Sequence, residues 1–444
     1  MPDLSIDFAG IKAPNPFWLA SGPPTNSGYQ VMKAFDAGWG GAVWKTLGVP
    51  IVNVSSRYGS INYRDTRMAG FNNIELITDR PLSDNLHEIE EVKKHFPDHA
   101  VIASLMVESR DEWEQIIRDV ENAGADGIEL NFGCPHGMCE RGMGSAVGQE
   151  PVVLETIVGW VMEAAKVPVI TKLTPNISHI VDPGLAAARG GSDAVSLINT
   201  IKSIMGIDLD TYAPYPIVDN KGTNGGYCGP AVKPIALEMV KELAQHPEIR
   251  HMPISGIGGI ETWRDAVEFI LLGASSLQVC TAVMHYGFGI VREMKAGLLE
   301  FMEQKGYEKI SDFVGLALPN VTEWKHLNLN YKVVAKIDQE KCIGCQLCYV
   351  ACDDGAHQAI RLIGSTESRV PEIIEENCVG CNLCALVCPV EECITMEHRD
   401  QGIAPVTWDE LAVRGEIPTT FDDDLAGGKG HHVPRPEEAL KFRK

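Results

Sequence analysis

Short apolar runs alternate with amphipathic segments between about residues 15 and 306. Each run is four to six residues long, ends in polar or glycine-rich sequence, and is typical of a buried strand. The predicted strands cover residues 17–21, 42–46, 101–106, 127–130, 169–173, 194–199, 253–256 and 276–281.

The segments between these runs carry helix signals. Ser109 and Glu112 have the spacing of a capping box, and Trp113, Ile116, Ile117 and Val120 follow on one face. Thr262 opens a similar helix, with Trp263, Val267 and Ile270 on its inner face. Eight strands alternating with helices over roughly 290 residues predict an α/β fold, a (β/α)8 TIM barrel. A doubly wound sheet remains the alternative, because counting strands separates the two poorly.

Two long connections interrupt this rhythm, at 48–80 and 202–230, and both are rich in Gly, Asn, Tyr and Pro. Connections of this length inside a compact domain are usually lids or binding loops. Both follow predicted strands, so we expect them at the carboxyl face of the barrel, where barrel enzymes place their active sites.

The barrel pattern stops near residue 320, which gives a domain at 1–320. We expect a linker at 321–336, a second domain at 337–400 and an extended tail at 401–444. The tail contains Asp422, Asp423 and Asp424, a glycine-rich stretch at 427–430 and little periodicity. Such composition favours a segment that orders only against another surface.

Composition is that of a globular protein, with 45% hydrophobic and 22% charged residues. The net charge of -22 argues against nucleic acid as a partner, since phosphate binding depends on Lys and Arg. The first residues lack the features of a signal peptide, and no run of about 18 apolar residues occurs. We therefore expect a cytoplasmic protein that does not enter membranes.

Eight of the 13 cysteines fall within residues 342–388, in two runs of C-x2-C-x2-C-x3-C spacing. Three closely spaced thiolates can hold one corner of a [4Fe-4S] cubane, while the fourth cysteine ligates the neighbouring cluster. This pattern predicts a ferredoxin-like domain with two clusters. Zinc fits poorly, because structural zinc usually uses two separated pairs of ligands. One cluster is assigned Cys342, Cys345, Cys348 and Cys388, and the other Cys378, Cys381, Cys384 and Cys352.

A further cysteine follows the predicted strand at 127–130. Cys134 lies in a loop with Gly133, Gly137, Gly142 and Gly144, where a barrel places its chemistry, and is the candidate for catalysis. The alternative is a buried structural cysteine in a glycine-rich connector.

Glycines at 256, 258 and 259, and the segment Gln278 to Thr281, follow the last two predicted strands. Barrels commonly bind phosphate there, although a tight glycine turn is an equal alternative. Beside iron–sulfur clusters the natural phosphate-bearing cofactor is FMN, because a flavin converts single electrons into hydride. No G-x-G-x-x-G lies between a strand and a helix, so we expect reducing equivalents from another polypeptide.

Several segments together resemble the dihydropyrimidine dehydrogenase family, in its two-subunit bacterial form without the FAD and NAD modules. The resemblance covers residues 1 to about 400. It implies reduction of uracil and thymine, with electrons from a partner flavoprotein that carries FAD and oxidises NADH. The matching segments are 19–24, 44–46, 73–76, 131–144, 172–176, 198–200 and the doubled cysteine run.

The resemblance also implies roles for individual residues. Cys134 matches the catalytic cysteine, and the pyrimidine-holding residues match Asn73, Asn131, Asn199 and Thr200. The FMN contacts match Ser21, Lys45, Thr46, Lys172, Gly229, Gly258, Gly259, Cys280 and Thr281. Two positions depart from the animal enzymes, which have a serine in place of Gly133 and a glycine in place of Cys139.

These residue types suit the implied chemistry. Carboxamides offer both donors and acceptors to a neutral pyrimidine edge. A thiol with an ordinary pKa of about 8.5 is protonated near neutrality and can deliver a proton to C5 while hydride reaches C6. Lys45 and Lys172 can stabilise negative charge on reduced flavin; surface lysines at the rim are the alternative. We expect His136 to cap the loop.

Two other functions fit part of the pattern. A dihydroorotate dehydrogenase has a similar barrel and cysteine loop, but its substrate carries a carboxylate and its chain normally lacks a fused two-cluster domain. An electron-relay scaffold would need neither a reactive thiol nor an asparagine-lined pocket. Cys139, Cys228 and Cys393 have no predicted role.

Overall fold

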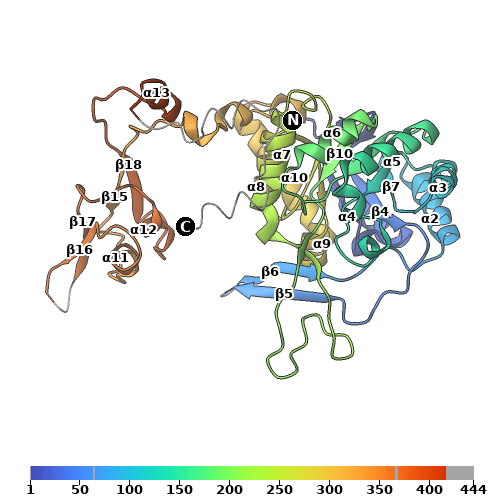
Figure 1. Ribbon diagram of the computed structural model, residues 1–444, viewed down its shortest axis with the longest axis horizontal. Helices are drawn as coiled ribbons and strands as arrows, with labels where there is room; N and C mark the ends of the chain where they lie inside the picture. The colour runs from blue at the N-terminus through green and yellow to red at the C-terminus, as the bar shows by residue number, and fades with distance from the viewer. Residues whose placement is uncertain (1, 64–65, 366–368, 417–444) are drawn as a thin grey trace, which may run out of the picture. The chain divides into compact units, whose positions relative to one another are not determined.

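Eight parallel strands close into a barrel in the computed structural model, which describes residues 2–63, 66–365 and 369–416 (Figure 1). The neighbour order around the barrel is β10-β13-β14-β3-β4-β7-β8-β9. All eight predicted strands are barrel strands, so the predicted (β/α)8 barrel is confirmed. Their bounds are β3 (Phe17–Leu19), β4 (Gly41–Leu47), β7 (Ala100–Leu105), β8 (Gly127–Asn131), β9 (Val169–Lys172), β10 (Ala194–Leu197), β13 (Ile254–Ile257) and β14 (Ala274–Val279).

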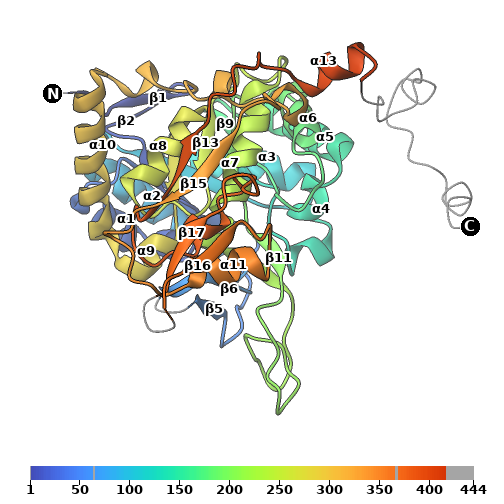
Figure 2. The ribbon, with the colours of Figure 1, turned by 90° about the vertical axis from the view of Figure 1, so that its left-hand side faces the viewer.

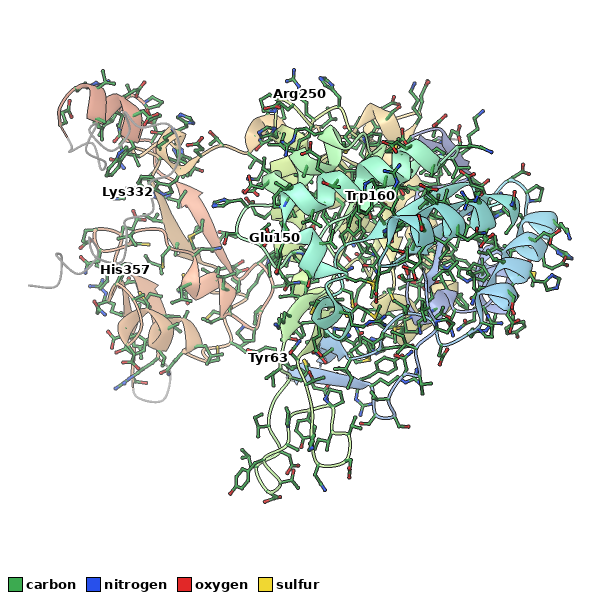
Figure 3. All side chains as sticks on the ribbon, turned by 45° about the vertical axis from the view of Figure 1, so that its right-hand side comes forward. Tyr63, Glu150, Trp160, Arg250, Lys332 and His357 are labelled. Carbon is green, nitrogen blue, oxygen red and sulfur yellow. The ribbon has the colours of Figure 1, made fainter. Side chains whose placement is uncertain are left out.

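Helices pack outside the strands, and Trp160, labelled in Figure 3, lies on one of them, α5. The predicted capping box is present: the Ser109 hydroxyl accepts from the Glu112 amide, and the Glu112 carboxylate accepts from the Ser109 amide at 2.8 Å. The helices are α1 (Gly28–Ala37), α2 (Leu82–His95), α3 (Arg110–Asn122), α4 (Ser145–Gly148), α5 (Pro151–Ala164), α6 (Val181–Arg189), α7 (Lys233–Gln245), α8 (Trp263–Leu271), α9 (Thr281–Tyr286) and α10 (Val291–Lys305).

A hairpin precedes the barrel, formed by β1 (Ile6–Phe8) and β2 (Ile11–Ala13). Phe8 and Ile11 are buried in a small core with Trp18, Val43 and Ile102, separate from the main core between strands and helices. Phe8 packs edge-on against Trp18, with ring centroids 5.5 Å apart.

The two long connections form one sheet rather than separate loops. Strands β11 (Ile201–Ser203), β12 (Gly225–Cys228), β6 (Thr66–Asn73) and β5 (Tyr58–Tyr63) pair in that order. Figures 1 and 2 both show the segment between β11 and β12 extending beyond this sheet, away from the barrel helices. Because both connections leave carboxyl ends of barrel strands, the sheet stands over the predicted active-site face.

Three predicted strands end two residues early: β3 stops at Leu19, β10 at Leu197 and β14 at Val279. Ser21, Asn199 and Thr281 therefore lie beyond the strands. A side chain in a strand must point into the barrel or toward the helices, whereas one just beyond it can turn to the open end.

A second compact unit starts at Val321. Its strands pair as β15 (Val333–Ile337) with β18 (Ile394–His398), and β16 (Ile360–Ile363) with β17 (Val370–Ile373). Short helices α11 (Leu347–Asp353) and α12 (Leu383–Leu386) each begin two residues after the second cysteine of a run and contain the third, Cys348 and Cys384. The predicted linker 321–336 was too long, because its last four residues belong to β15.

The first part of the predicted tail folds back on the start of this unit. Helix α13 (Trp408–Val413) places Trp408 edge-on against Trp324, with ring centroids 5.5 Å apart. The Leu329 amide donates to the Val406 carbonyl at 2.8 Å. Residues 401–416 are thus not an extended segment, and 417–444 lie outside the described residues.

Candidate active site

A cavity of about 1130 Å³, including its mouth, opens at the carboxyl ends of the barrel strands. It brings together every residue that the sequence assigned to substrate or flavin, although they come from widely separated segments. These lining residues are Ser21, Lys45, Thr46, Asn73, Asn131, Cys134, Lys172, Asn199, Thr200, Gly229, Gly258, Gly259, Cys280 and Thr281.

A row of hydrogen-bonded side chains crosses one side of the cavity. The Asn131 amide donates to the Thr46 hydroxyl at 2.9 Å, and Asn131 Oδ1 accepts from Asn199 Nδ2 at 2.9 Å. Asn199 Oδ1 accepts from the Thr200 backbone amide at 2.8 Å. Asn73, at the end of β6, also lines the cavity, and its side-chain amide donates to the Gly226 carbonyl on β12 at 3.4 Å. These bonds hold the amides in fixed orientations before any ligand binds.

Cys134 begins a tightly folded loop that runs to Gly144. Its thiol donates to the His136 carbonyl at 3.4 Å. A Cβ on Gly144 would lie 2.8 Å from the Cys134 carbonyl oxygen, and the residue has φ +59°, so glycine is needed for this close approach. Burial raises the pKa of the Cys134 thiol to about 11. The thiol is therefore protonated at neutral pH, more firmly than an exposed cysteine.

His136 fastens the Cys134 loop to the segment that follows β6. Its Nε2 lies 3.1 Å from the Glu75 carbonyl oxygen, to which it donates, and burial lowers the pKa of its imidazole. The ring is neutral at pH 7. Its Nδ1 makes no hydrogen bond within the described residues. His136 thus joins two segments rather than only capping its own loop.

Both predicted flavin lysines are paired with buried carboxylates. Lys45 forms an ion pair with Glu75, which also accepts from Tyr58 and lies 3.3 Å from Arg57. The pKa of Tyr58 is raised by burial and by its bond to Glu75. Lys172 Nζ lies 3.3 Å from the carboxylate of Glu129. Neither lysine is the surface residue that the sequence left open as an alternative.

Sequence reasoning missed Glu75, Tyr58 and Glu129. Glu75 lies inside one of the segments that carry the resemblance. Its partners Tyr58 and Lys45 are 17 and 30 residues away along the chain, and no sequence pattern links them to it. Glu129 did carry a signal: it is an acidic residue inside a buried strand, flanked by Ile128 and Leu130, and charged side chains are seldom fully buried without a partner.

Three glycines give the cavity a backbone wall. Gly229, Gly258 and Gly259 have φ angles of +88°, +128° and +73°. A Cβ would lie 2.9 Å from Ala236 Cβ at Gly258 and 2.8 Å from Lys233 Cβ at Gly259. Side chains are excluded here, and main-chain groups line this part of the cavity. Such a wall fits a phosphate-bearing cofactor.

In the second unit the eight cysteines line two separate cavities. One, of about 310 Å³, contains Cys342, Cys345, Cys348 and Cys388, together with Cys393. The other, of about 360 Å³, contains Cys378, Cys381, Cys384 and Cys352, with His357 (labelled in Figure 3) in its wall. Each cavity takes three cysteines from one run and the last cysteine of the other, the grouping that the spacing predicted.

Within the described residues no three His, Cys, Asp or Glu side chains converge as a group that could hold a single metal ion. The cysteines of each cavity instead surround a space. Separately, no helix in the described part of the chain combines the length and apolar character needed to span a bilayer.

Comparison with known sequence families gives matches in both units. The family described as dihydroorotate dehydrogenase matches residues 3–302, and the 4Fe-4S dicluster domain matches residues 335–396. A (β/α)8 barrel of this family joined to an iron–sulfur domain defines an oxidoreductase.

Three relatives narrow the class. The NAD-dependent dihydropyrimidine dehydrogenase subunit PreA of Escherichia coli strain K12 is 46% identical over 389 residues, which is 87% of this chain and 94% of PreA. The chloroplastic dihydropyrimidine dehydrogenase (NADP(+)) of Arabidopsis thaliana is 44% identical, over 77% of this chain and 82% of the relative. The catalytic subunit of dihydroorotate dehydrogenase B (NAD(+)) from Pyrococcus horikoshii is 39% identical, over 71% of this chain and 98% of the relative. This chain belongs to the dihydropyrimidine dehydrogenase family.

Proposed function

We propose that this chain reduces uracil and thymine to their 5,6-dihydro forms, reversibly, as the pyrimidine-reducing subunit of a two-subunit enzyme. The observation that carries the proposal is the shared cavity of a protonated thiol, Cys134, and the amides of Asn73, Asn131 and Asn199. The relative PreA is named a subunit of an NAD-dependent dihydropyrimidine dehydrogenase, which supports both the substrate class and the need for a partner.

The amides and Thr200 provide the substrate contacts. A pyrimidine base is flat and neutral and alternates N–H and C=O groups around its edge, so carboxamides complement it without charge. Asn131 and Asn199 are held by hydrogen bonds to each other and to Thr46. Little side-chain entropy is then lost when a base binds beside them.

Cys134 provides the proton. FMN bound in the same cavity would supply hydride from its N5 to C6 of the base. The Cys134 thiol would give its proton to C5, and the buried thiolate that remains is reprotonated from solvent. Because burial raises the pKa of this thiol to about 11, the acid form is fully populated at the start of each turnover.

The cavity wall fits FMN by the nature of its groups. Main-chain groups around Gly229, Gly258 and Gly259 suit the phosphate, together with Thr281 and Cys280 nearby. The same cavity is lined by the asparagines and by Lys45, Lys172, Ser21 and Thr46, which would hold the flavin ring.

The two cysteine cavities would hold one [4Fe-4S] cluster each, with the ligand sets given above. Clusters pass single electrons, and the flavin of the barrel would collect them in pairs. We infer that the electrons come from a partner flavoprotein that binds FAD and oxidises NADH.

The acid role is tested with Cys134→Ala. With reduced methyl viologen as electron donor in place of the partner, we expect uracil turnover to fall by at least about 100-fold, the usual contribution of a general acid. Bound FMN should still be reduced by dithionite. Cys139→Ala is the matched control from the same loop and should keep its activity. Unimpaired turnover in Cys134→Ala would refute the acid role.

Cofactor content tests the rest of the proposal. Anaerobically purified chain should contain one FMN and about eight iron atoms, as two [4Fe-4S] clusters require. The isolated chain should not oxidise NADH. Protein without flavin would favour the alternative of an electron-relay scaffold.

Dihydroorotate dehydrogenase activity is the second candidate, because the Pyrococcus horikoshii relative carries that name. Its substrate has a carboxylate that needs an available cation. The cavity cations Lys45 and Lys172 are each paired with a glutamate, which favours a neutral base. Comparing turnover of orotate and uracil by the same preparation separates the two.

A further inference from the structure

Glu129 lies in the barrel interior below the cavity, with no exposed surface. Its Oε2 accepts hydrogen bonds from the Ser196 hydroxyl at 2.8 Å and from the Gln278 side-chain amide at 2.9 Å. Its Oε1 lies 3.3 Å from Lys172 Nζ. Glu129 does not line the cavity, but its partners Lys172 and Gln278 do. Whatever it contributes to the site must therefore act through these two residues and through its charge.

Two oxygens of this arrangement have unused hydrogen-bonding capacity. Glu129 Oε1 meets Lys172 Nζ as an ion pair at 3.3 Å and accepts no hydrogen bond within the described residues. The side-chain oxygen of Gln278 is also without a hydrogen-bond partner there, although the residue is only 1% exposed. Buried polar groups are nearly always satisfied, so the unpaired oxygen of Gln278, a residue that lines the cavity, indicates a ligand that completes it.

A buried carboxylate needs compensation, because removing a charge from water is strongly unfavourable. Here the compensation comes from one ammonium group and two neutral donors on β9, β10 and β14. The carboxylate sets where the ammonium and the amide lie, since both are drawn to the same two oxygens. The result is a pair with no net charge directly beside the cavity.

We propose that Glu129 is a positioning residue for the flavin: it holds Lys172 and Gln278 against the ring and lowers the flavin reduction potential. The proposal rests on the FMN site proposed above. Reduced flavin carries negative charge, which Lys172 alone would stabilise strongly. Glu129 offsets that stabilisation, so the reduced cofactor remains a strong enough hydride donor for a neutral ring that has no activating charge.

A similar pair at the same cavity is formed by Lys45 and Glu75. Glu75, however, lines the cavity and can touch ligands directly. Substitution of Glu129 therefore tests the effect of a buried charge without removing a group that can contact the ligand.

The test is the midpoint potential of bound FMN, measured by anaerobic titration in the full chain. Glu129→Gln keeps the shape of the side chain and removes its charge, so the potential should rise. Ser196→Ala removes a hydrogen bond that delocalises the negative charge of the Glu129 carboxylate. The potential should therefore fall, opposite to the rise in Glu129→Gln. The matched control is Glu155→Gln on α5, which removes the charge from an exposed 2.8 Å ion pair with Arg189 of α6 and should leave the potential unchanged.

Opposite shifts in the two variants would support the proposal, because a loosened fold would not produce them. Unchanged potentials with FMN bound one to one, or shifts of the same sign, would overturn it. If Glu129→Gln loses its flavin, Ser196→Ala alone decides: a lowered potential supports the proposal and an unchanged one refutes it. Wild-type protein without flavin would instead refute the proposed function, so the two failures are distinguishable.

Discussion

Asn199 donates a hydrogen bond from its side-chain amide to the side-chain oxygen of Asn131, at 2.9 Å. The same oxygen accepts from the Gly133 backbone amide at 3.3 Å. An amide oxygen has two acceptor sites, so that of Asn131 is fully occupied and its orientation is fixed. Both asparagines line the cavity, and Gly133 leaves room for their contact because it has no Cβ.

Gly133→Ala should disturb the pyrimidine site. A Cβ at this position would lie 2.3 Å from Asn199 Cβ and 2.4 Å from Asn199 Nδ2, so the asparagine must move and its bond to Asn131 is lost. We expect kcat/KM for uracil to fall about tenfold to 100-fold, the effect of losing one or two buried polar contacts. FMN content should not change. Steady-state kinetics with reduced methyl viologen measures the effect.

Gly159→Ala is the control for that substitution, because a Cβ on this helical glycine meets nothing within 4 Å. It should leave the kinetics unchanged. Uracil kinetics in Gly133→Ala equal to those of wild type would show that Asn199 does not hold the base.

The Cys134 thiol should react slowly with alkylating agents near neutral pH. Reactivity follows the thiolate fraction, and burial raises the pKa of this thiol to about 11. Labelling by iodoacetamide, followed by peptide mass spectrometry, should increase about tenfold per pH unit between pH 7 and pH 10 without a plateau. A plateau below pH 9 would contradict the raised pKa.

The same shift links pH to stability. The pKa of the Cys134 thiol is higher in the folded chain than in the unfolded chain, where the thiol is exposed to water, so the unfolded chain loses the proton first. This contribution to stability is complete below about pH 9 and is lost as the pH rises through about 11. In Cys134→Ala, the free energy of unfolding should fall less steeply over that interval, as measured by chemical denaturation.

The exchange of cysteines between the two cavities predicts which thiols each substitution releases. In Cys388→Ser, Cys342, Cys345 and Cys348 should become open to alkylation while the second cavity stays protected, because Cys388 completes the first cavity. Iron should fall from about eight to about four atoms per chain. In Cys352→Ser the pattern should reverse.

Cys393→Ser is the control for the cysteine experiment. Cys393 lines the first cavity but donates to the Asp338 carbonyl at 3.6 Å, and the spacing gave it no cluster role. It should keep its full iron content. If Cys388→Ser instead exposed Cys378, Cys381 and Cys384, which belong to the same run as Cys388, each run would hold its own cluster.

Trp408→Ala should loosen the segment that folds back in the second unit. The edge-on contact with Trp324 contributes about 1 kcal/mol beyond burial. Amide hydrogen exchange should become faster across residues 404–413 and at Leu329, whose amide bonds to Val406. Val413→Ala, at a side chain that is 89% exposed, is the control and should show wild-type exchange. Unchanged exchange in Trp408→Ala would mean that the ring contact does not hold this segment.

The features that could be predicted from the sequence, the barrel strands and the grouping of the cysteines, depend on local sequence patterns. Barrel strands are buried on both faces, so their apolar runs stand out, and the cysteine spacing indicated the exchange between runs. The sequence did not predict strand β5, because Tyr58–Tyr63 is exposed and has no apolar alternation. The ion pair between Lys45 and Glu75 could not be predicted either. It depends on how the sheet of β5, β6, β11 and β12 packs on the barrel, because Glu75 follows β6. The predicted linker includes the first four residues of β15, because this strand is only five residues long and only two of its residues are buried.

The crossed cysteine cavities have a consequence for how the second unit is made. Neither set of four is complete until Cys388 has joined the first cavity and Cys352 the second. A nascent chain that has emerged only as far as the first run has three of the four thiols of the first cavity, because its fourth cysteine, Cys352, lines the second cavity. Insertion of the two proposed clusters would therefore have to wait until the whole segment from 342 to 388 has left the ribosome, and the halves of this unit would not mature one after the other.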